Sequence, residues 1–267
     1  GIDPYSKVSV IDFLGNGTGC IVWSSSLPQY ANSPLRYIDL MGGKKPHLMK
    51  SYSNGMGKSI SLKYKSSTKY YLADKLAGTP WATKLPFPVH CIEEITTSDA
   101  VSETTYKQSY AYHHGYYDHA EREFRGFGRV DTIDIDAAVI NHSTLSIEHL
   151  NQDPVLTKSW YHTGAWMEFE LLTDAYAKEY FIANQENEIG TAISIPTGLS
   201  AKEQREAYRA MKGSPLRQEI YALDGSAKEG IPYAITSFGY CILKLQSAVS
   251  PSFGGGRGEV AVFFNYQ

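Results

Sequence analysis

The stretch Tyr110-Ala-Tyr-His-His-Gly-Tyr-Tyr-Asp-His-Ala-Glu-Arg-Glu-Phe-Arg-Gly-Phe-Gly128 is the part of the sequence richest in aromatic and charged side chains. Successive side chains of a β-strand point to opposite faces, and aromatic residues suit the half-buried surface of a sheet. We therefore interpret the stretch as two strands around a turn at Gly115, followed by a charged strand. This predicts that the fold is built on antiparallel pairing.

The charged strand predicts ion pairs across the sheet. Arg122 and Arg125 alternate with carboxylates and lie among aromatic residues, so we expect at least one of the two arginines to be partly buried and paired. The residues that we assign to this structural motif are Tyr112, Gly115, Tyr117, Asp118, Glu121, Arg122, Glu123, Phe124, Arg125, Gly126, Phe127 and Gly128.

Outward from this stretch, short alternating segments bounded by Gly, Asn and Pro predict further strands. We expect strands at 7–11, 20–23, 36–40, 47–52, 58–64, 89–97, 103–112, 126–135, 155–166, 217–223, 232–246 and 259–266. We expect helices only at 67–76, 174–184 and 200–212, the second capped by Asp174 and the third by a capping box, Ser200-Ala-Lys-Glu203. The pattern predicts an all-β, mainly antiparallel fold with a few short helices.

One polar stretch is weakly periodic and favours a boundary within the chain. We expect an N-terminal β segment at 1–135, a loop or insertion at 136–153, and a C-terminal β segment with short helices at 154–267. The length of 267 residues allows one large domain or two small ones.

The composition argues against two classes of partner. The chain carries 25 Lys and Arg against 28 Asp and Glu, a net charge of −3, so charge gives no reason to expect nucleic-acid binding. The sequence has no long apolar run of the kind that spans a bilayer, so we expect no direct membrane insertion.

A metal site is disfavoured although its ligand types are present. His113, His114, Asp118 and His119 are close in sequence, but neighbouring residues on a strand face opposite sides, and no His-Glu-x-x-His motif occurs. We therefore expect no metal and no cofactor.

Two enzymatic interpretations are also disfavoured. Glu121 and Glu123 share a strand face as a glycosidase pair could, but the neighbouring arginines neutralise them, which favours structural ion pairing. The glycine-rich run 15–19 lacks the Lys-Ser or Lys-Thr of a phosphate loop and predicts a turn. We expect no catalytic residue.

Several blocks of the sequence together resemble one protein family, the B component of insecticidal toxin complexes (Tc toxins). The blocks that carry the resemblance are Asp12-Phe-Leu-Gly-Asn-Gly-Thr-Gly-Cys-Ile-Val-Trp-Ser-Ser25, Tyr37-Ile-Asp-Leu-Met-Gly-Gly-Lys-Lys-Pro-His47, Tyr71-Leu-Ala-Asp-Lys75, Gly78-Thr-Pro-Trp81, Leu85-Pro-Phe-Pro-Val-His90, Tyr112-His-His-Gly-Tyr-Tyr-Asp118, Glu121-Arg-Glu-Phe-Arg-Gly-Phe-Gly128, Lys158-Ser-Trp-Tyr-His-Thr-Gly164 and Leu216-Arg-Gln-Glu-Ile-Tyr221. They follow the family order from about Lys7 to Gln267, in the middle region of the B component.

The resemblance implies a structural role in a secreted toxin complex. It implies a strip of a β-sheet shell related to Rhs/YD-repeat proteins, which encloses a toxic enzyme carried by the C component. The implied partners are the remainder of the B component, with its propeller and shell, the C component and the pore-forming A component.

The residues leave a second possibility open. The chain has 20 Tyr and 4 Trp, and aromatic rings on a sheet surface can stack on sugars, so a carbohydrate-binding or adhesin-like β module is the alternative.

Overall fold

Strands are the main secondary structure of the computed structural model, which describes residues 3–137, 153–182, 192–247 and 261–267. The strands are β1 (Lys7–Ile11), β2 (Cys20–Ser24), β3 (Leu35–Asp39), β4 (Ser51–Ser53), β5 (Lys58–Ser66), β6 (His90–Asp99), β7 (Thr104–Asp118), β8 (Glu123–Ala137), β9 (Val155–Tyr161), β10 (Ile193–Ser194), β11 (Pro215–Ala222), β12 (Ala234–Ser237), β13 (Tyr240–Gln246) and β14 (Val262–Tyr266). The helices are the 3-10 helix η1 (Pro28–Tyr30), α1 (Ser67–Leu76), α2 (Phe169–Glu179) and α3 (Ala201–Ala210).

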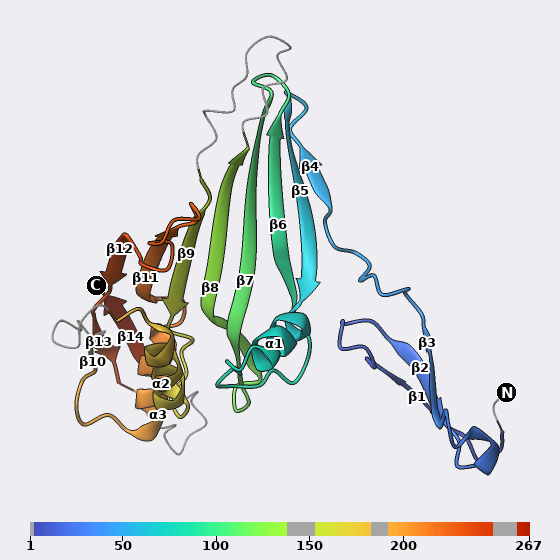
Figure 1. Cartoon of the computed structure of the whole chain (residues 1–267). Coiled ribbons are helices and arrows are strands. Elements are labelled where there is room, and N and C mark those ends of the chain that lie inside the picture. Colours follow the sequence, from blue (N-terminus) through green and yellow to red (C-terminus); the bar gives the residue numbers. More distant parts are fainter. Residues whose placement is uncertain (1–2, 138–152, 183–191, 248–260) are drawn as a thin grey trace, which may run out of the picture.

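One large sheet, here called the wall, has the strand order β12-β11-β9-β8-β7-β6-β5-β4, and all of its neighbours pair antiparallel. Figure 1 shows it as a fan of long strands. The predicted all-β, mainly antiparallel fold is confirmed. Strands from both sides of the predicted loop at 136–153 share this sheet, and most of that loop lies outside the described residues.

Two smaller sheets flank the wall. The N-terminal sheet, β1-β2-β3, is antiparallel, and in the third sheet β10 runs parallel to β13 while β14 runs antiparallel. The N-terminal sheet points away from the wall (Figure 1). Its glycine turn reaches the wall, where Ser66 Oγ donates to Gly15 O (3.0 Å) and His90 Nε2 donates to Asn16 O (2.7 Å).

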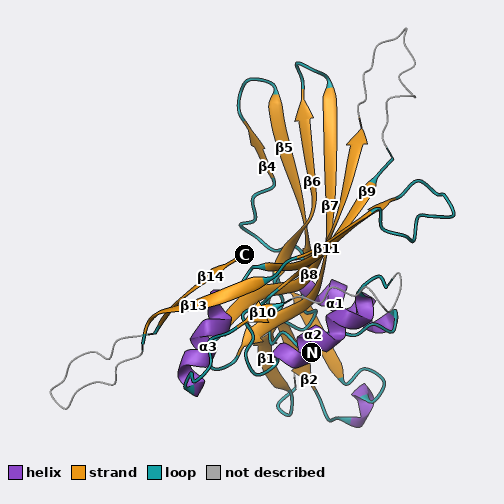
Figure 2. Ribbon diagram, turned by 90° about the vertical axis from the view of Figure 1, so that its left-hand side faces the viewer, coloured by secondary structure: helices purple, strands orange, loops and turns teal. Residues whose placement is uncertain are grey.

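The three α-helices gather at one end of the wall, and the other end is a single layer of strands (Figure 1 and Figure 2). Pairing of β6 with β7 stops at Glu94 and Ser109, so the strands diverge below that point. Helix α1 packs where they diverge, and the hydroxyl of its Tyr70 donates to Tyr110 O (3.0 Å). The helices thus cover the end at which the strands separate.

Helix α2 begins earlier than the sequence analysis predicted. It starts at Phe169, so Asp174 lies inside the helix rather than at its cap, and its N-cap residue Glu168 makes no side-chain capping bond. Leu172 and Tyr176 are buried against Trp160 of β9, so the apolar stripe, and not a cap, positions this helix. Helices α1 and α3 lie where they were predicted, and the Ser200–Glu203 capping box is present.

Three strand predictions were too long. Only Ser51 and Tyr52 of the predicted 47–52 strand lie in β4, because His47 takes a positive φ of 62° just after Pro46. Strand β9 ends at Tyr161, and Gly164 then turns with φ 75°. The predicted 232–246 strand is interrupted at residues 238–239, where it passes from the wall to the third sheet.

A glycine in β8 permits the close approach of α2, and this can be tested. A β-carbon on Gly128 would collide with the hydroxyl of Tyr176, whereas one on Gly230 would meet nothing within 4 Å. We expect Gly128→Ala to lower the free energy of unfolding by about 1–3 kcal/mol through overpacking. Gly230→Ala is the matched control and should change it by less than about 0.5 kcal/mol. Urea denaturation of both variants measures the difference, and equal midpoints would contradict this packing.

Candidate functional site

The sequence motif at 112–128 forms the lower part of the hairpin between β7 and β8. The turn of this hairpin lies at residues 119–122, where Asp118 Oδ1 accepts hydrogen bonds from the backbone N–H groups of Ala120 (2.9 Å) and Glu121 (3.0 Å). The predicted turn at Gly115 is therefore wrong. Gly115 lies inside β7, and glycine is needed there because a β-carbon would come within 2.6 Å of Leu85 and 2.9 Å of Trp81.

Of the two arginines in the motif, Arg125 is the buried one. Its side chain has no exposed surface, and it contacts Asp118 (2.8 Å) and Glu123 (3.4 Å). It also donates to the backbone carbonyl of Gly164 (2.6 Å), just beyond β9. Arg122 is exposed in the turn with a φ of 56°. The expected buried ion pair therefore forms at Arg125.

Helix α3 completes this group of charges. Arg205 reaches Glu121 (2.9 Å), and Lys212, just past the helix, reaches Glu123 (2.8 Å). We call the group the tip cluster; its members are Asp118, Glu121, Glu123, Arg125, Arg205, Arg209 and Lys212. The hydrogen bond from Lys212 lowers the pKa of Glu123, which makes this carboxyl a poor general acid near neutral pH.

The aromatic members of the motif form the apolar side of the hairpin. The ring of Phe127 packs against Tyr112 (centroids 4.9 Å apart), Phe124 (5.4 Å) and Trp81 (6.0 Å). Tyr117 packs edge-on against Phe87 (5.2 Å). Gly126 takes a positive φ of 99° where the register shifts between Gly126 and Phe124.

A second group of charges, the central cluster, is largely buried and lies farther up the same hairpin. Its members are Asp74 of α1, His113 and His114 of β7, Arg129 and Asp131 of β8, and Glu179 of α2. Arg129 forks onto both oxygens of Asp131 (2.7 and 2.6 Å) and also reaches Glu179 (3.1 Å). Such a two-point bond between arginine and carboxylate fixes both distance and orientation.

The two adjacent histidines both belong to this cluster. His113 contacts Asp74 (2.6 Å) and Asp131 (3.5 Å), whereas His114 contacts Glu179 (2.9 Å). The expectation that neighbouring histidines serve opposite faces fails because His114 takes a positive φ of 54° within β7. That backbone conformation is rare outside glycine and turns the His114 ring toward α2.

Burial and charge act in opposite directions on the ionisable groups of the central cluster. Burial alone would lower the pKa of His113, but hydrogen bonds to Asp131 and Asp74 outweigh it and raise that pKa. Burial would raise the pKa of Glu179, but the bond from His114 and the charge of Arg129 lower it to about 2. The cluster therefore favours a protonated His113 beside ionised carboxylates.

A third group of polar contacts lies on β11. Glu219 is completely buried and accepts hydrogen bonds from Arg217 Nε (2.7 Å), the Tyr221 hydroxyl (2.6 Å) and the Phe181 backbone (2.9 Å). The cross-strand register forms one row across the wall from His113, Arg129, Trp160 and Arg217. Asp131 lies two residues after Arg129, and Glu219 two residues after Arg217, so both lie on the same face as the row. One face of the wall thus carries both buried groups.

Sequence reasoning missed the partners that complete the central cluster. The pair Arg129 and Asp131 had a signal, because residues two apart on a strand share a face. Asp74 and Glu179 had none, since they come from helices 39 and 65 residues from the histidines that they contact. Their positions follow from tertiary packing alone.

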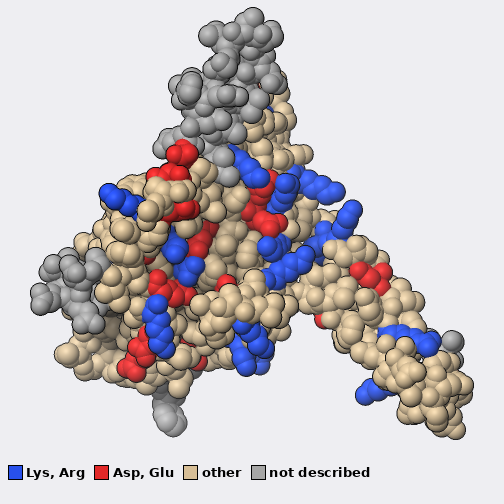
Figure 3. Space-filling model, in the orientation of Figure 1, with Lys and Arg blue, Asp and Glu red and all other residues tan. Residues whose placement is uncertain are grey.

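Charged side chains of both signs intermingle over the wall in the view of Figure 3. Glu94 of β6 contacts Lys63 of β5 (2.7 Å) and Lys107 of β7 (2.6 Å) across the strands. Opposite charges directly across a sheet stabilise its register.

The described residues contain no group of three or more His, Cys, Asp or Glu side chains arranged to hold a metal ion. Among the helices that the structure describes, none is long and apolar enough to cross a membrane.

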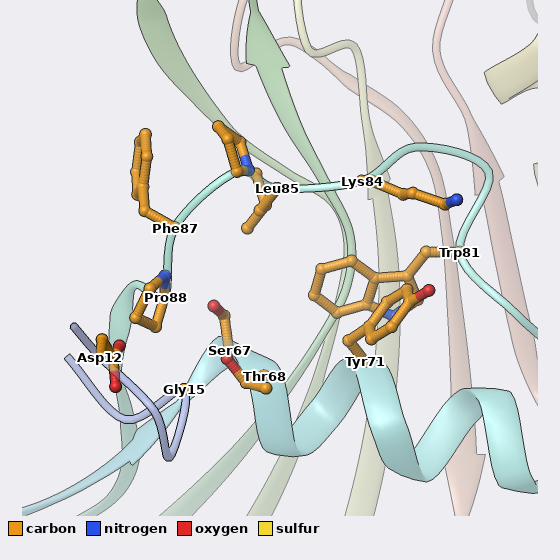
Figure 4. Close-up of a pocket in the computed structure, with 11 residues that line it drawn as sticks. Asp12, Gly15, Ser67, Thr68, Tyr71, Trp81, Lys84, Leu85, Phe87 and Pro88 are labelled. Atoms are coloured by element: carbon orange, nitrogen blue, oxygen red, sulfur yellow. The ribbon is translucent and has the colours of Figure 1, made fainter. Parts of the chain in front are cut away.

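A pocket of about 490 Å³ lies at the joint between the N-terminal sheet and the wall. Figure 4 shows Thr68 and Tyr71 of α1, Trp81 and Leu85 of the following segment, and Gly15 of the glycine turn around it. The indole N–H of Trp81 is held by Asp74 (2.6 Å) and its ring packs against Tyr71 and Phe127. Trp81 is thus held in place by these contacts while it lines the pocket.

These features define a mainly antiparallel β-sheet protein whose hairpin motif joins strands to helices by ion pairs. The chain belongs to the insecticide toxin TcdB family: the model of the "Insecticide toxin TcdB middle/N-terminal region" matches residues 3–164, and that of the "Insecticide toxin TcdB middle/C-terminal region" matches residues 206–255. The predicted resemblance to the middle region of a Tc toxin B component is confirmed. No curated protein matches the chain.

Solved structures of Tc toxins share this fold. The crystal structure of TcdB2-TccC3-TEV is 26% identical, with a TM-score of 0.77 over 99% of this chain. TcdB2-TccC3-Cdc42 gives 26% and 0.76 over 99%, and the Photorhabdus luminescens Tc holotoxin pore gives 27% and 0.76 over 99%. In each case the match covers 12% of the solved chain, so this chain spans a small part of their length.

The two arginines of the motif make a matched pair for mutation. Removing one partner of a buried ion pair costs about 3–5 kcal/mol, because the other charge stays buried without compensation. We therefore expect Arg125→Ala to lower the free energy of unfolding by an amount of that order. We expect Arg122→Ala, on the exposed turn, to change it by less than about 0.5 kcal/mol. Urea unfolding followed by tryptophan fluorescence measures both, and a similar response of the two variants would overturn the assignment.

Proposed function

We propose that this chain is a non-enzymatic wall segment of a Tc toxin B component, part of a β-sheet shell that encloses a toxic enzyme and delivers it. The observation that carries the proposal is the match of 99% of the chain to TcdB2 in complex with TccC3. The architecture supports it, because a single-layer sheet held by ion pairs suits a wall better than a ligand site.

The free edges of the sheets support a segment that continues into further sheet. The wall ends in β4 and β12, and the third sheet ends in β14, so each of these strands pairs on one side within the described residues. An unpaired edge offers backbone N–H and C=O groups to another strand. Because the matched chains are about eight times longer, their remaining polypeptide supplies candidate strands.

The solved complexes suggest the partners. TcdB2 is found with TccC3 in one structure, and another is a Tc holotoxin pore that contains a TccC3 variant. We propose that this segment acts with the remainder of a B component, including its propeller and shell, with a C component and with the pore-forming A component. The complex would be secreted, and the segment itself would neither insert into a membrane nor bind nucleic acid.

Catalysis is not part of the proposal because the candidate carboxylates are engaged. Glu121 and Glu123 contact Arg205 and Lys212, and Asp118 is shared between the turn and Arg125. A carboxyl with a cation in contact stays ionised near neutral pH and cannot deliver a proton.

A chimera tests the proposed function. Residues 3–267 replace the matching segment of TcdB2, and the chimera is produced together with TccC3. We expect a complex that co-elutes on size exclusion and shields the C-terminal region of TccC3 from protease, because a closed wall excludes the protease. TcdB2 with the segment deleted is the control and should leave TccC3 open to cleavage. A chimera that binds TccC3 but protects it no better than the deletion would contradict the wall function.

The edge strand β14 gives a test on the isolated chain. Val262, Phe264 and Tyr266 are exposed, and Phe264 lies opposite exposed Leu243 of β13. Because β14 is an apolar edge, we expect the isolated chain to self-associate through it. Val262→Lys should increase the monomer fraction in sedimentation velocity without loss of fold, since a lysine blunts an edge. Lys7→Arg on β1 is the control. An unchanged monomer in both variants would count against a free edge.

A further inference from the structure

His162 occupies the joint between the wall, α2 and α3. It is 2% exposed, and its ring lies against Phe169 of α2 (centroids 4.9 Å apart) and Tyr208 of α3 (5.8 Å). Its backbone N–H donates to Ser214 O (2.9 Å), and its carbonyl accepts from Gly213 N (2.8 Å). One residue thus links the end of β9 to both helices and to the segment that leads into β11.

The hydrogen bonds of the His162 ring favour its neutral form. Nδ1 accepts from the backbone N–H of Gly164 (2.9 Å), so the single proton of the neutral ring is on Nε2. Among the described residues Nε2 is buried without a hydrogen-bond partner. A second proton would have to enter at Nδ1, where it would face the N–H of Gly164. Protonation therefore breaks that bond.

The charge of Arg125 opposes a positive charge on His162. Arg125 of β8 bonds to Gly164 O (2.6 Å), two residues away from His162. From α3 and its C-terminal end, the Arg209 Cα and the Lys212 Cβ lie 3.5 and 3.3 Å from where a β-carbon of Gly164 would be. Three basic residues thus border the loop that carries the imidazole.

Two carboxylates lie at the start of α2. The N-cap residue Glu168 accepts from the Tyr116 hydroxyl (2.9 Å), whereas the charge of Glu170 acts on Tyr208, whose ring packs against His162. The carboxylates of Asp118 and Glu123 contact Arg125. The surroundings of the His162 ring therefore differ from those of the His113 ring, which lies between two carboxylates.

We propose that His162 is an acid-sensitive switch: its protonation breaks the bond from Gly164 and loosens α2 and α3 from the wall. The shell function requires no response to pH, so this inference goes beyond it. Its test uses the isolated chain and is independent of the chimera.

The expected pH window follows from the pKa of His162. Burial and then the charge of Arg125 lower this pKa to about 4, whereas an unfolded histidine takes up a proton near 6.5. Between these values only the unfolded chain gains the proton, so stability falls as the pH falls. The ratio of folded to unfolded chain should drop by up to about tenfold per pH unit, or about thirtyfold at pH 5.

The experiment compares wild type, His162→Phe and the control His47→Asn in urea from pH 7 to pH 4.5. Phenylalanine keeps the ring contacts but cannot be protonated, and His47 is exposed with a φ of 62° that asparagine tolerates. Between pH 6.5 and pH 5 we expect the ratio of folded to unfolded chain to fall about fifteenfold more in the wild type and His47→Asn than in His162→Phe. An equal loss in all three proteins would overturn the proposal.

Hydrogen exchange locates the opening. At pH 5, amides of residues 162–164 and 208–214 should exchange at least tenfold faster in wild type than in His162→Phe, while those of β7 should not differ. If His162→Phe fails to fold, an NMR titration of the His162 ring in the wild type decides the question. A pKa near 6.5 in the folded protein would refute the switch, and a pKa below about 5 would support it.

Discussion

The fold depends on the ion pairs and hydrogen bonds that the carboxylate of Glu179 makes. This carboxylate of α2 receives Arg129 of β8, His114 of β7 and the indole N–H of Trp160 of β9. A buried carboxylate without partners costs far more than an exposed one, so the helix and three strands can be placed only together. The central cluster is therefore where wall and helices become one structure.

Ion pairs suit this wall because most of it is a single layer. A single-layer sheet cannot bury many apolar side chains, so apolar burial defines its register weakly. Paired charges define it strongly: slipping β8 by one residue would move Arg129 and Asp131 to the face opposite Glu179. The row from His113 through Arg129 to Trp160 thus fixes the strand register. The two-point bond of Arg129 to Asp131 sets the orientation of these two side chains.

Much of the fold could be predicted from local patterns. Period-two alternation located the long strands, and the Ser200–Glu203 capping box located α3, because both signals act over a few residues. Helix α2 was misplaced because its start has no capping side chain and is set by Leu172 and Tyr176 packing on the wall. Gly115 was taken for a turn because its need for space arises from Leu85 and Trp81, about 30 residues away.

Local patterns also predicted only part of the candidate site. The arginine and carboxylate run of the motif predicted buried pairing, which occurs at Arg125. The contributions of Asp74, Glu179 and α3 could not be predicted from the sequence, since no regular spacing along the chain relates them to the hairpin. His114 was misjudged for a different reason: a positive φ inside a strand cancels the rule that neighbours face apart. Such a backbone exception belongs to the three-dimensional surroundings and leaves no mark in the pattern.

Two histidines, in different parts of the structure, respond to acid in opposite ways. His113 lies between Asp74 and Asp131, and those bonds raise its pKa, so acid favours the charged form that the central cluster already holds. The pKa of Glu179 is lowered to about 2, so that carboxylate remains ionised at pH 5. Burial and the charge of Arg125 lower the pKa of His162 to about 4, so its surroundings disfavour the charged form that acid promotes. If acid loosens this chain, the joint at α2 and α3 opens first, and the long strands of the wall stay in register because their own ion pairs are intact.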